Sequence, residues 1–172
     1  MSFSDAEKIL RCAYSGQDGD AELFVAANKN VFIFDHSARR WYRFVNHYWE
    51  LDMKNHALDA VKKITDIYAS ELYRHKKLIS EADEEKAAYY ENIRKHFLEK
   101  LKRIRNKRWK EDVLVLAASG DKGLGITGNE WDQEPLLLAV ANGIIDLKTG
   151  TLIPGRPDQY IKTVSPIQYL ED

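Results

Sequence analysis

The stretch NHALDAVKKITDIYASELYRHKKL (residues 55–78) repeats its apolar side chains every three or four positions. This spacing predicts an amphipathic helix of about six turns. A second stripe with the same period predicts another long helix from about Glu81 to Asn106. Ser80 and Asp83 predict a capping box at its start. Two such neighbours form an antiparallel hairpin or cross each other. The stripes are Leu58, Val61, Ile64, Tyr68, Leu72 and His75, then Tyr90, Ile93, Phe97, Leu101 and Ile104.

Shorter elements precede this helical centre. Residues 3–14 and 21–29 have helical patterns, and the glycine-containing GQDGD between them (16–20) predicts a turn. Three runs rich in β-branched and aromatic residues then predict a small antiparallel β meander over residues 31–51. Its aromatic side chains form either a stacking platform or, in the interpretation that we favour, a sheet face packed under the helix at 55–78. These side chains are Phe32, Phe34, Trp41, Tyr42, Phe44, Tyr48 and Trp49.

After the helices the pattern changes. Residues 111–118 predict a third, shorter helix, and a glycine-rich loop (120–135) follows it. Strands are predicted near 138–141, 144–147 and 151–153, because Asn142-Gly143 and Lys148–Gly150 are strong turn signals. We therefore predict one α+β domain over residues 1–172. It comprises short helices and the β meander (1–51), the helical part (52–119), and the glycine-rich loop, a β-hairpin and an extended tail (120–172).

The composition excludes several classes of protein. The chain has 172 residues, of which 44% are hydrophobic and 31% charged, which is typical of globular proteins. Its single cysteine, Cys12, excludes an internal disulfide framework and a multi-cysteine zinc site. No apolar run is long enough to span a membrane, and the N-terminus does not resemble a secretion signal. We therefore expect a cytoplasmic protein.

The charge is strongly segregated along the chain. The segment RKHFLEKLKRIRNKRWK (residues 94–110) carries a net charge of +8, whereas the whole chain carries −1. Such a segment is either a solvated helix face or a contact surface for an anion. Trp109 and His96 offer ring surfaces on which bases could stack. The residues predicted to contact a nucleic acid are Lys100, Lys102, Arg103, Arg105, Lys107, Arg108, Trp109 and Lys110.

No pattern predicts a catalytic centre. Gly123, Gly125 and Gly128 match the spacing of a dinucleotide-binding loop, but Pro135 falls inside the helix that this motif requires. There is no Walker A or HExxH motif, and the histidines lack metal-ligand spacing. We expect no catalytic residue, no metal site and no cofactor in this chain. A nucleotide-binding enzyme that uses the 123–128 loop stays open as an alternative, as does a protein–protein adaptor without DNA contact.

Two stretches carry a resemblance to a known family. They are RRWYRFVNHYWELD, which leads into the first long helix, and residues 133–172, which contain NGIIDLKTG. The pattern resembles the helicase-associated N-terminal domain, a collar or connector, of phage and plasmid primases, the group that includes poxvirus primase–helicases. The resemblance spans roughly residues 15–172. The matching residues are Asp132, Pro135, Leu136, Leu137, Asn142, Gly143, Asp146, Leu147, Thr149, Gly150, Tyr160 and Tyr169.

The resemblance implies a role in DNA replication. In that family the domain lies between a primase and a superfamily 3 helicase, and this chain stops where the helicase would begin. The resemblance therefore implies a non-catalytic segment that links primase to helicase ring and contributes to DNA contact or assembly. Its implied partners are DNA, the adjacent primase and helicase domains, and further copies of the full-length protein. ATP and Mg²⁺ are implied only for the helicase of the parent protein.

Overall fold

The computed structural model describes residues 3–170, and these form a mixed α+β fold, as predicted. They fold into two compact units, each built from two segments. The helical unit contains the residues up to Ala27 and Leu58–Ser119. The sheet unit contains Asn28–Ala57 and the residues from Gly120 onward. The organisation as one domain stays a prediction, because compactness does not show whether a unit folds by itself.

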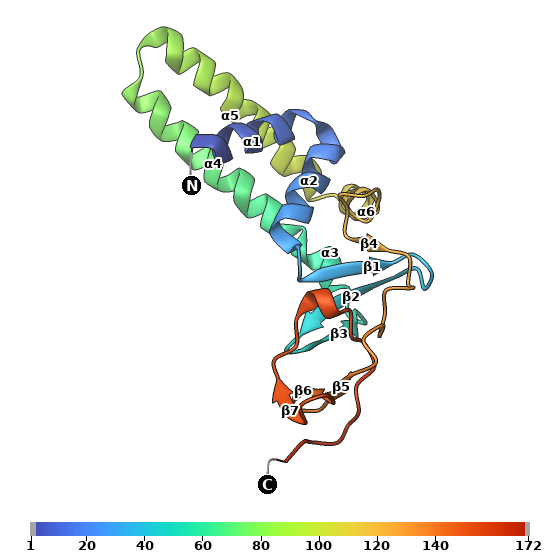
Figure 1. Cartoon of the computed structure of the whole chain (residues 1–172). Coiled ribbons are helices and arrows are strands. Elements are labelled where there is room, and N and C mark those ends of the chain that lie inside the picture. The colour runs from blue at the N-terminus through green and yellow to red at the C-terminus, as the bar shows by residue number, and fades with distance from the viewer. Residues whose placement is uncertain (1–2, 171–172) are drawn as a thin grey trace. The chain divides into compact units, whose positions relative to one another are not determined.

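The helical unit is built on the predicted hairpin. Figure 1 shows α4 (Lys62–Glu81) and α5 (Glu84–Ile104) as an antiparallel pair, with α1 (Phe3–Tyr14) lying across them. The predicted stripes form its core, in which Ile64, Tyr68 and Phe97 are completely buried. Each such side chain contributes roughly 1.5–3 kcal/mol on burial. α2 (Gly16–Asn28) and α6 (Lys107–Ala117) complete the unit.

Several details of the helices differ from the prediction. The helix at 55–78 is divided into α3 (His56–Ala60) and α4, which meet at Val61. The N-cap of α5 is Asp83, whose carboxylate accepts a hydrogen bond from Lys86 N at 2.9 Å, and not Ser80. The predicted turn at 16–20 is the first part of α2. Gly19 permits this helix, because a Cβ there would overlap the backbone carbonyl of Cys12 in α1.

The sheet unit contains a four-stranded sheet of order β3-β2-β1-β4. The predicted meander is confirmed as β1 (Phe32–Asp35), β2 (Arg40–Val45) and β3 (Tyr48–Leu51). β4 (Gly125–Ile126) adds a short parallel strand beside β1, which no sequence signal predicts. One face packs Ile33 and Trp49 against Trp131, with Tyr160 at the margin. The loop and tail therefore cover this face, where the sequence predicts the helix at 55–78.

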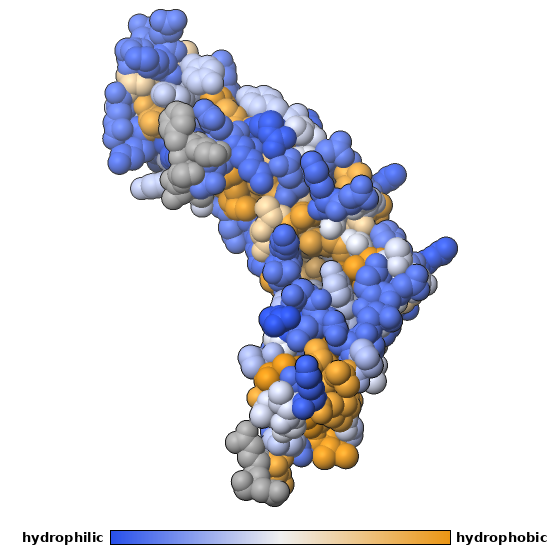
Figure 2. Space-filling model, in the orientation of Figure 1, coloured by the Kyte–Doolittle hydropathy of each residue, from blue (hydrophilic) through white to orange (hydrophobic). Residues whose placement is uncertain are grey.

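A second sheet follows the glycine-rich loop. It contains β5 (Leu137–Val140), β6 (Gly143–Asp146) and β7 (Thr151–Ile153), close to the predicted strands and all antiparallel. Its inner face packs Ala139 and Ile144 against Ile161 from the tail. The tail contains a short 3₁₀ turn, η1 (Pro157–Gln159), which was predicted only as extended chain. In Figure 2 apolar residues gather over this sheet, where half-exposed leucines include Leu136, Leu138 and Leu147.

Candidate nucleic-acid interface

The basic segment 94–110 lies on two helices that meet at a corner of the helical unit. α5 ends at Ile104, and α6 begins at Lys107. Asn106 separates them: its backbone is extended (φ −69°, ψ 131°) and its Oδ1 accepts a hydrogen bond from Arg108 N at 2.9 Å. An N-cap of this kind starts a new helix. α6 therefore begins four residues before the predicted third helix, whose apolar period becomes visible only after its cationic first turn.

The cations at the two helix ends differ in their effect on helix stability. Lys102 and Arg103 lie in the last turn of α5, where positive charge complements the exposed carbonyl groups. Lys107, Arg108 and Lys110 lie in the first turn of α6, which contains no acidic residue. Their charges oppose the positive end of the α6 dipole. Helix stability therefore explains the cations at the end of α5 but not those at the start of α6.

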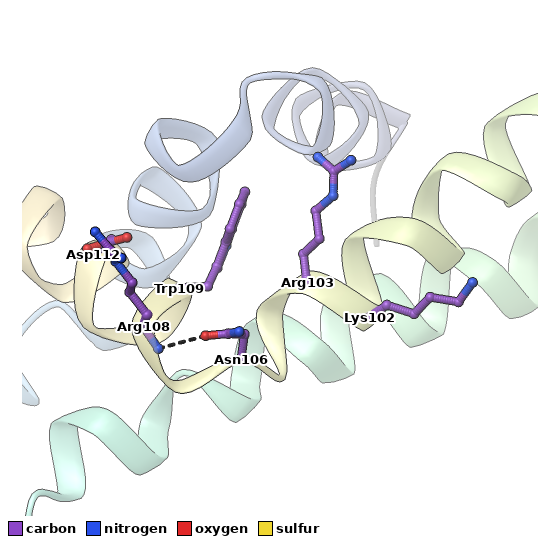
Figure 3. A pocket seen from close by; sticks show the side chains of 6 residues that line it. All are labelled: Lys102, Arg103, Asn106, Arg108, Trp109 and Asp112. Carbon is purple, nitrogen blue, oxygen red and sulfur yellow. Dashed lines mark hydrogen bonds between the residues drawn. The ribbon is translucent and has the colours of Figure 1, made fainter.

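A pocket of about 370 Å³ opens at this corner. Figure 3 shows the Trp109 ring edge-on, with the Arg103 side chain rising from α5 across the pocket from it. The backbone of Asn106 turns beneath them, between the two helices. The pocket is lined by Lys102, Arg103, Asn106, Arg108, Trp109 and Asp112. The corner thus combines an indole ring with three cations in a single concave surface.

The exposed cations are only partly neutralised by neighbouring carboxylates. Lys102 pairs with Glu99 at 2.9 Å and Lys107 pairs with Glu111 at 3.4 Å, and both pairs are well exposed. Exposed pairs of this kind contribute little and exchange readily with solvent ions. Within residues 3–170, four cations of the corner make no ion pair: Arg103, Arg105, Arg108 and Lys110.

Lys100 differs from the other predicted contact residues, because it is buried. Only 3% of Lys100 is exposed, and its Nζ donates to Asp20 Oδ2 at 2.8 Å and to the Gly16 carbonyl at 2.9 Å. A buried ammonium with two protein acceptors is held by the core of the domain. We therefore correct the predicted set: Lys100 supports the corner from inside and presents no charge to a phosphate in this structure.

Trp109 is held by the same carboxylate. Its Nε1 donates to Asp20 Oδ2 at 2.7 Å, and the Lys100 Nζ lies 5.2 Å from the centre of its ring. Tyr68 OH donates to the other oxygen of Asp20, which is completely buried. Burial and the neighbouring carboxylate raise the pKa of Tyr68, so its hydroxyl stays protonated. Asp20 thus joins α2, α4, α5 and α6 at one point. Sequence analysis misses this residue, because it places GQDGD in a turn.

In the glycine-rich loop of the sheet unit, the backbone amides are bonded to a carboxylate of the loop itself, that of Glu130. Glu130 accepts hydrogen bonds from Thr127 N at 3.1 Å and from Gly128 N at 2.8 Å, in addition to the Thr127 hydroxyl. Burial acts to raise the pKa of Glu130, but these hydrogen bonds outweigh it and lower the pKa. The chain after Gly128 continues in turns rather than in a helix. The arrangement that a bound dinucleotide requires is therefore not formed here.

Several residues of the C-terminal sequence pattern fasten the tail. Asn142 exchanges two hydrogen bonds with the backbone of Tyr169, whose hydroxyl donates to the Gly150 carbonyl at 2.6 Å. Asp132 accepts a hydrogen bond from the Thr163 hydroxyl at 2.7 Å and two from backbone amides beside it. These residues therefore fix the tail, as far as Tyr169, to the second sheet and its preceding loop.

The comparison with known proteins agrees with this pattern. A family model described as "D5 N terminal like" matches residues 21–172. The chain belongs to this family. D5 N-terminal-like domains are the N-terminal domains of primase–helicases of phages, plasmids and poxviruses, and they are accessory domains with no known catalytic role. The resemblance seen in the sequence is thereby confirmed. No curated protein matches the chain.

Two further features concern the described residues as a whole. No helix of residues 3–170 is long and apolar enough to cross a membrane. Within the same range, no group of three or more histidine, cysteine, aspartate or glutamate side chains is arranged to hold a metal ion.

Proposed function

We propose that this domain contacts DNA through the α5–α6 corner while it links the primase and the superfamily 3 helicase ring of its parent protein. The observation that carries the DNA contact is the set of cations in and beside the first turn of α6, where they oppose the helix dipole. Arg103, Arg105, Arg108 and Lys110 make no close ion pair among the described residues, so a phosphate backbone would supply a negative partner.

The remaining residues of the predicted set have different roles in this proposal. Lys102 and Lys107 can exchange their exposed carboxylate partners for phosphates at little cost. Trp109 forms a wall of the pocket and keeps Arg103 and Arg108 apart (Figure 3). Lys100 does not contact DNA in this proposal, and it affects the contact only by supporting the position of the Trp109 ring.

The link to primase and helicase rests on family membership. A D5 N-terminal-like domain is accessory to a primase–helicase, and we propose that the parent protein works in the cytoplasm of a bacterial or phage-infected cell. In this proposal ATP and Mg²⁺ serve the helicase of the parent protein, and no residue of the present chain is assigned to hold them.

Fluorescence anisotropy with labelled single-stranded, forked and duplex oligonucleotides tests the DNA contact. Four phosphate contacts on a single strand predict a slope of about −3 in a plot of log affinity against log salt. The affinity should then fall about 50-fold between about 50 and 200 mM salt. The variant R103Q/R105Q/R108Q/K110Q should bind weakly and should lose the part of the slope that these four cations contribute, about −3.

The control variant K62Q/K76Q/K77Q/K86Q removes the same charge from exposed lysines of the same unit, on and beside the α4–α5 hairpin. It should bind like the wild type, because location rather than net charge determines the contact. The proposed contact is wrong if the wild type binds no oligonucleotide at low salt, or if both variants bind equally. Capture of this domain by the purified helicase domain, without any binding of DNA, would instead support the protein–protein adaptor.

A further inference from the structure

A stacked pair of rings lies on the helical unit beside the cationic corner. The rings of Tyr14, at the end of α1, and His96, on α5, have centroids 4.0 Å apart and planes only 13° from parallel. The His96 Nε2 donates a hydrogen bond to the Ala13 carbonyl at 3.0 Å, since a carbonyl can only accept. This bond fixes the imidazole plane, and the imidazole in turn fixes the tyrosine ring.

The fixed tyrosine ring is open to solvent on its other side. Tyr14 is 58% exposed although His96 covers one of its faces. A ring that is rigid, flat and half exposed can accept another aromatic ring on its free face without losing further side-chain freedom.

The backbone that follows Tyr14 leads from this ring to the edge of the pocket. The Gly16 carbonyl accepts a hydrogen bond from Lys100 at 2.9 Å. One residue further, the Gln17 side chain donates to Asp112 at 2.8 Å, and Asp112 lines the pocket. The ring and the pocket therefore lie near each other on the helical unit, at α5, α6 and the junction of α1 with α2.

The spacing along α5 gives the distance between ring and cation. His96, Lys100 and Arg103 follow each other at four and three residues, which places them on one side of the helix. From His96 to Arg103 the helix rises about 10 Å. A short length of nucleic acid strand can therefore reach the ring and the guanidinium together.

We propose that Tyr14, held by His96, is a stacking platform for a base of single-stranded DNA whose phosphates lie on the cations of the α5–α6 corner. This proposal rests on the proposed function and specifies its substrate. Aromatic rings beside a cationic surface bind single strands without sequence preference, because every base has a flat face. The bases of a duplex are already stacked on each other, so the platform gives no advantage to duplex DNA.

The test compares two tyrosines that differ in their surroundings. Y14L removes the proposed platform, Y14F keeps an aromatic ring, and Y73L removes a tyrosine on α4 that is 76% exposed and has no ring partner among the described residues. We expect Y14L to bind a single strand at least about fivefold more weakly, with the salt slope unchanged because stacking releases no counterions. Y14F and Y73L should bind like the wild type, and duplex binding should not change in any of them.

Two measurements keep the test independent of how well a variant folds. A strand with abasic sites should bind the wild-type domain more weakly than the intact strand, and 2-aminopurine in the intact strand should lose fluorescence on binding. The platform is refuted if abasic and intact strands bind the wild type equally, or if Y14L binds and quenches like the wild type. These results leave the charge-dependent contact in place, whereas a wild type that binds no strand at all refutes both proposals.

Discussion

The indole nitrogen of Trp109 and the ammonium of Lys100 donate to the same oxygen of Asp20, at 2.7 and 2.8 Å. This completely buried carboxylate therefore determines the position of the pocket wall as well as the stability of the helical unit. Its removal would leave Lys100 charged, buried and without its ion-pair partner.

We expect D20A to lower the free energy of unfolding by about 3–5 kcal/mol, since breaking a buried ion pair isolates its partner. Urea denaturation followed by circular dichroism measures this loss. D18A, at an exposed position in the first turn of the same helix, should cost less than about 1 kcal/mol, since it loses only an interaction with the helix dipole. The double variant D20A/K100M should lose less than the sum of the single losses. Strictly additive losses would contradict the pairing.

The sheet unit should become less stable in acid because of Asp35. Burial acts to raise the pKa of Asp35, but hydrogen bonds from Ser37, Ala38 and Trp131 outweigh it and lower the pKa from 3.8 to about 2. A carboxyl with a lowered pKa stabilises the fold above the pKa of the unfolded chain. This contribution, about 2 kcal/mol, should disappear as the pH falls from about 4 to about 2.

Unfolding by urea at a series of pH values measures this dependence. The difference in stability between wild type and D35N should be largest near neutral pH and should shrink over the acid range. D121N, which changes an exposed carboxylate, should follow the wild-type curve. A difference between wild type and D35N that stays constant down to pH about 2 would show that Asp35 does not titrate as described.

Gly128 should tolerate no side chain. Its φ is +97°, and a Cβ would overlap the Ser37 hydroxyl and lie 2.9 Å from Asp35 Oδ1. We expect G128A to cost more than about 2 kcal/mol, as thermal denaturation would reveal. Gly150 provides the matched control, because its φ is +70° but a Cβ there meets open space. G150A should therefore cost only the backbone strain, about 1 kcal/mol. Equal losses would rule out the clash.

The corner between α5 and α6 should depend on the side chain of Asn106. N106A removes the acceptor for the Arg108 amide and should cost about 1 kcal/mol of unfolding free energy. N106S keeps a capping oxygen and should retain most of the stability. Denaturation curves of both variants measure the difference. If alanine and serine at this position were equally stable, the cap would contribute nothing to the corner.

The parts of the fold that follow a regular period could be predicted from the sequence. Ile64, Tyr68 and Phe97 fall on stripes and are buried. The hairpin of β5 and β6 is likewise present as predicted, but its turn is Ala141-Asn142, because Gly143 already pairs with Val140. The start of α2 could not be found, because Gly16 and Gly19 are typical of turns. The role of Gly19 becomes evident only from its close contact with the Cys12 backbone in α1. β4 could not be predicted either, because a strand of two residues is too short to show an alternation of apolar and polar side chains.

The candidate site also combines features that the sequence pattern reveals with features that depend on the folded structure. The cationic segment is evident in the sequence. Charge alone, however, does not show that Lys100 is the buried residue among the predicted contacts. The helical spacing does contain a signal: Lys100 lies three residues after Phe97 and four before Ile104, both fully buried, and so falls on the apolar stripe. Its partner Asp20 and the stacking of Tyr14 on His96 join residues about 80 positions apart, and only the folded chain brings them together.

The chain passes from one compact unit to the other after Ala27, after Ala57 and after Ser119. Neither unit is therefore encoded by an uninterrupted stretch of the gene. Trimming the protein from its beginning would take Asp20 from the α4–α5 hairpin, and trimming it from its end would take β4 and Trp131 from the first sheet. A minimal fragment cannot be obtained by shortening the termini; it would need a rearranged gene in which the two segments of one unit are joined directly.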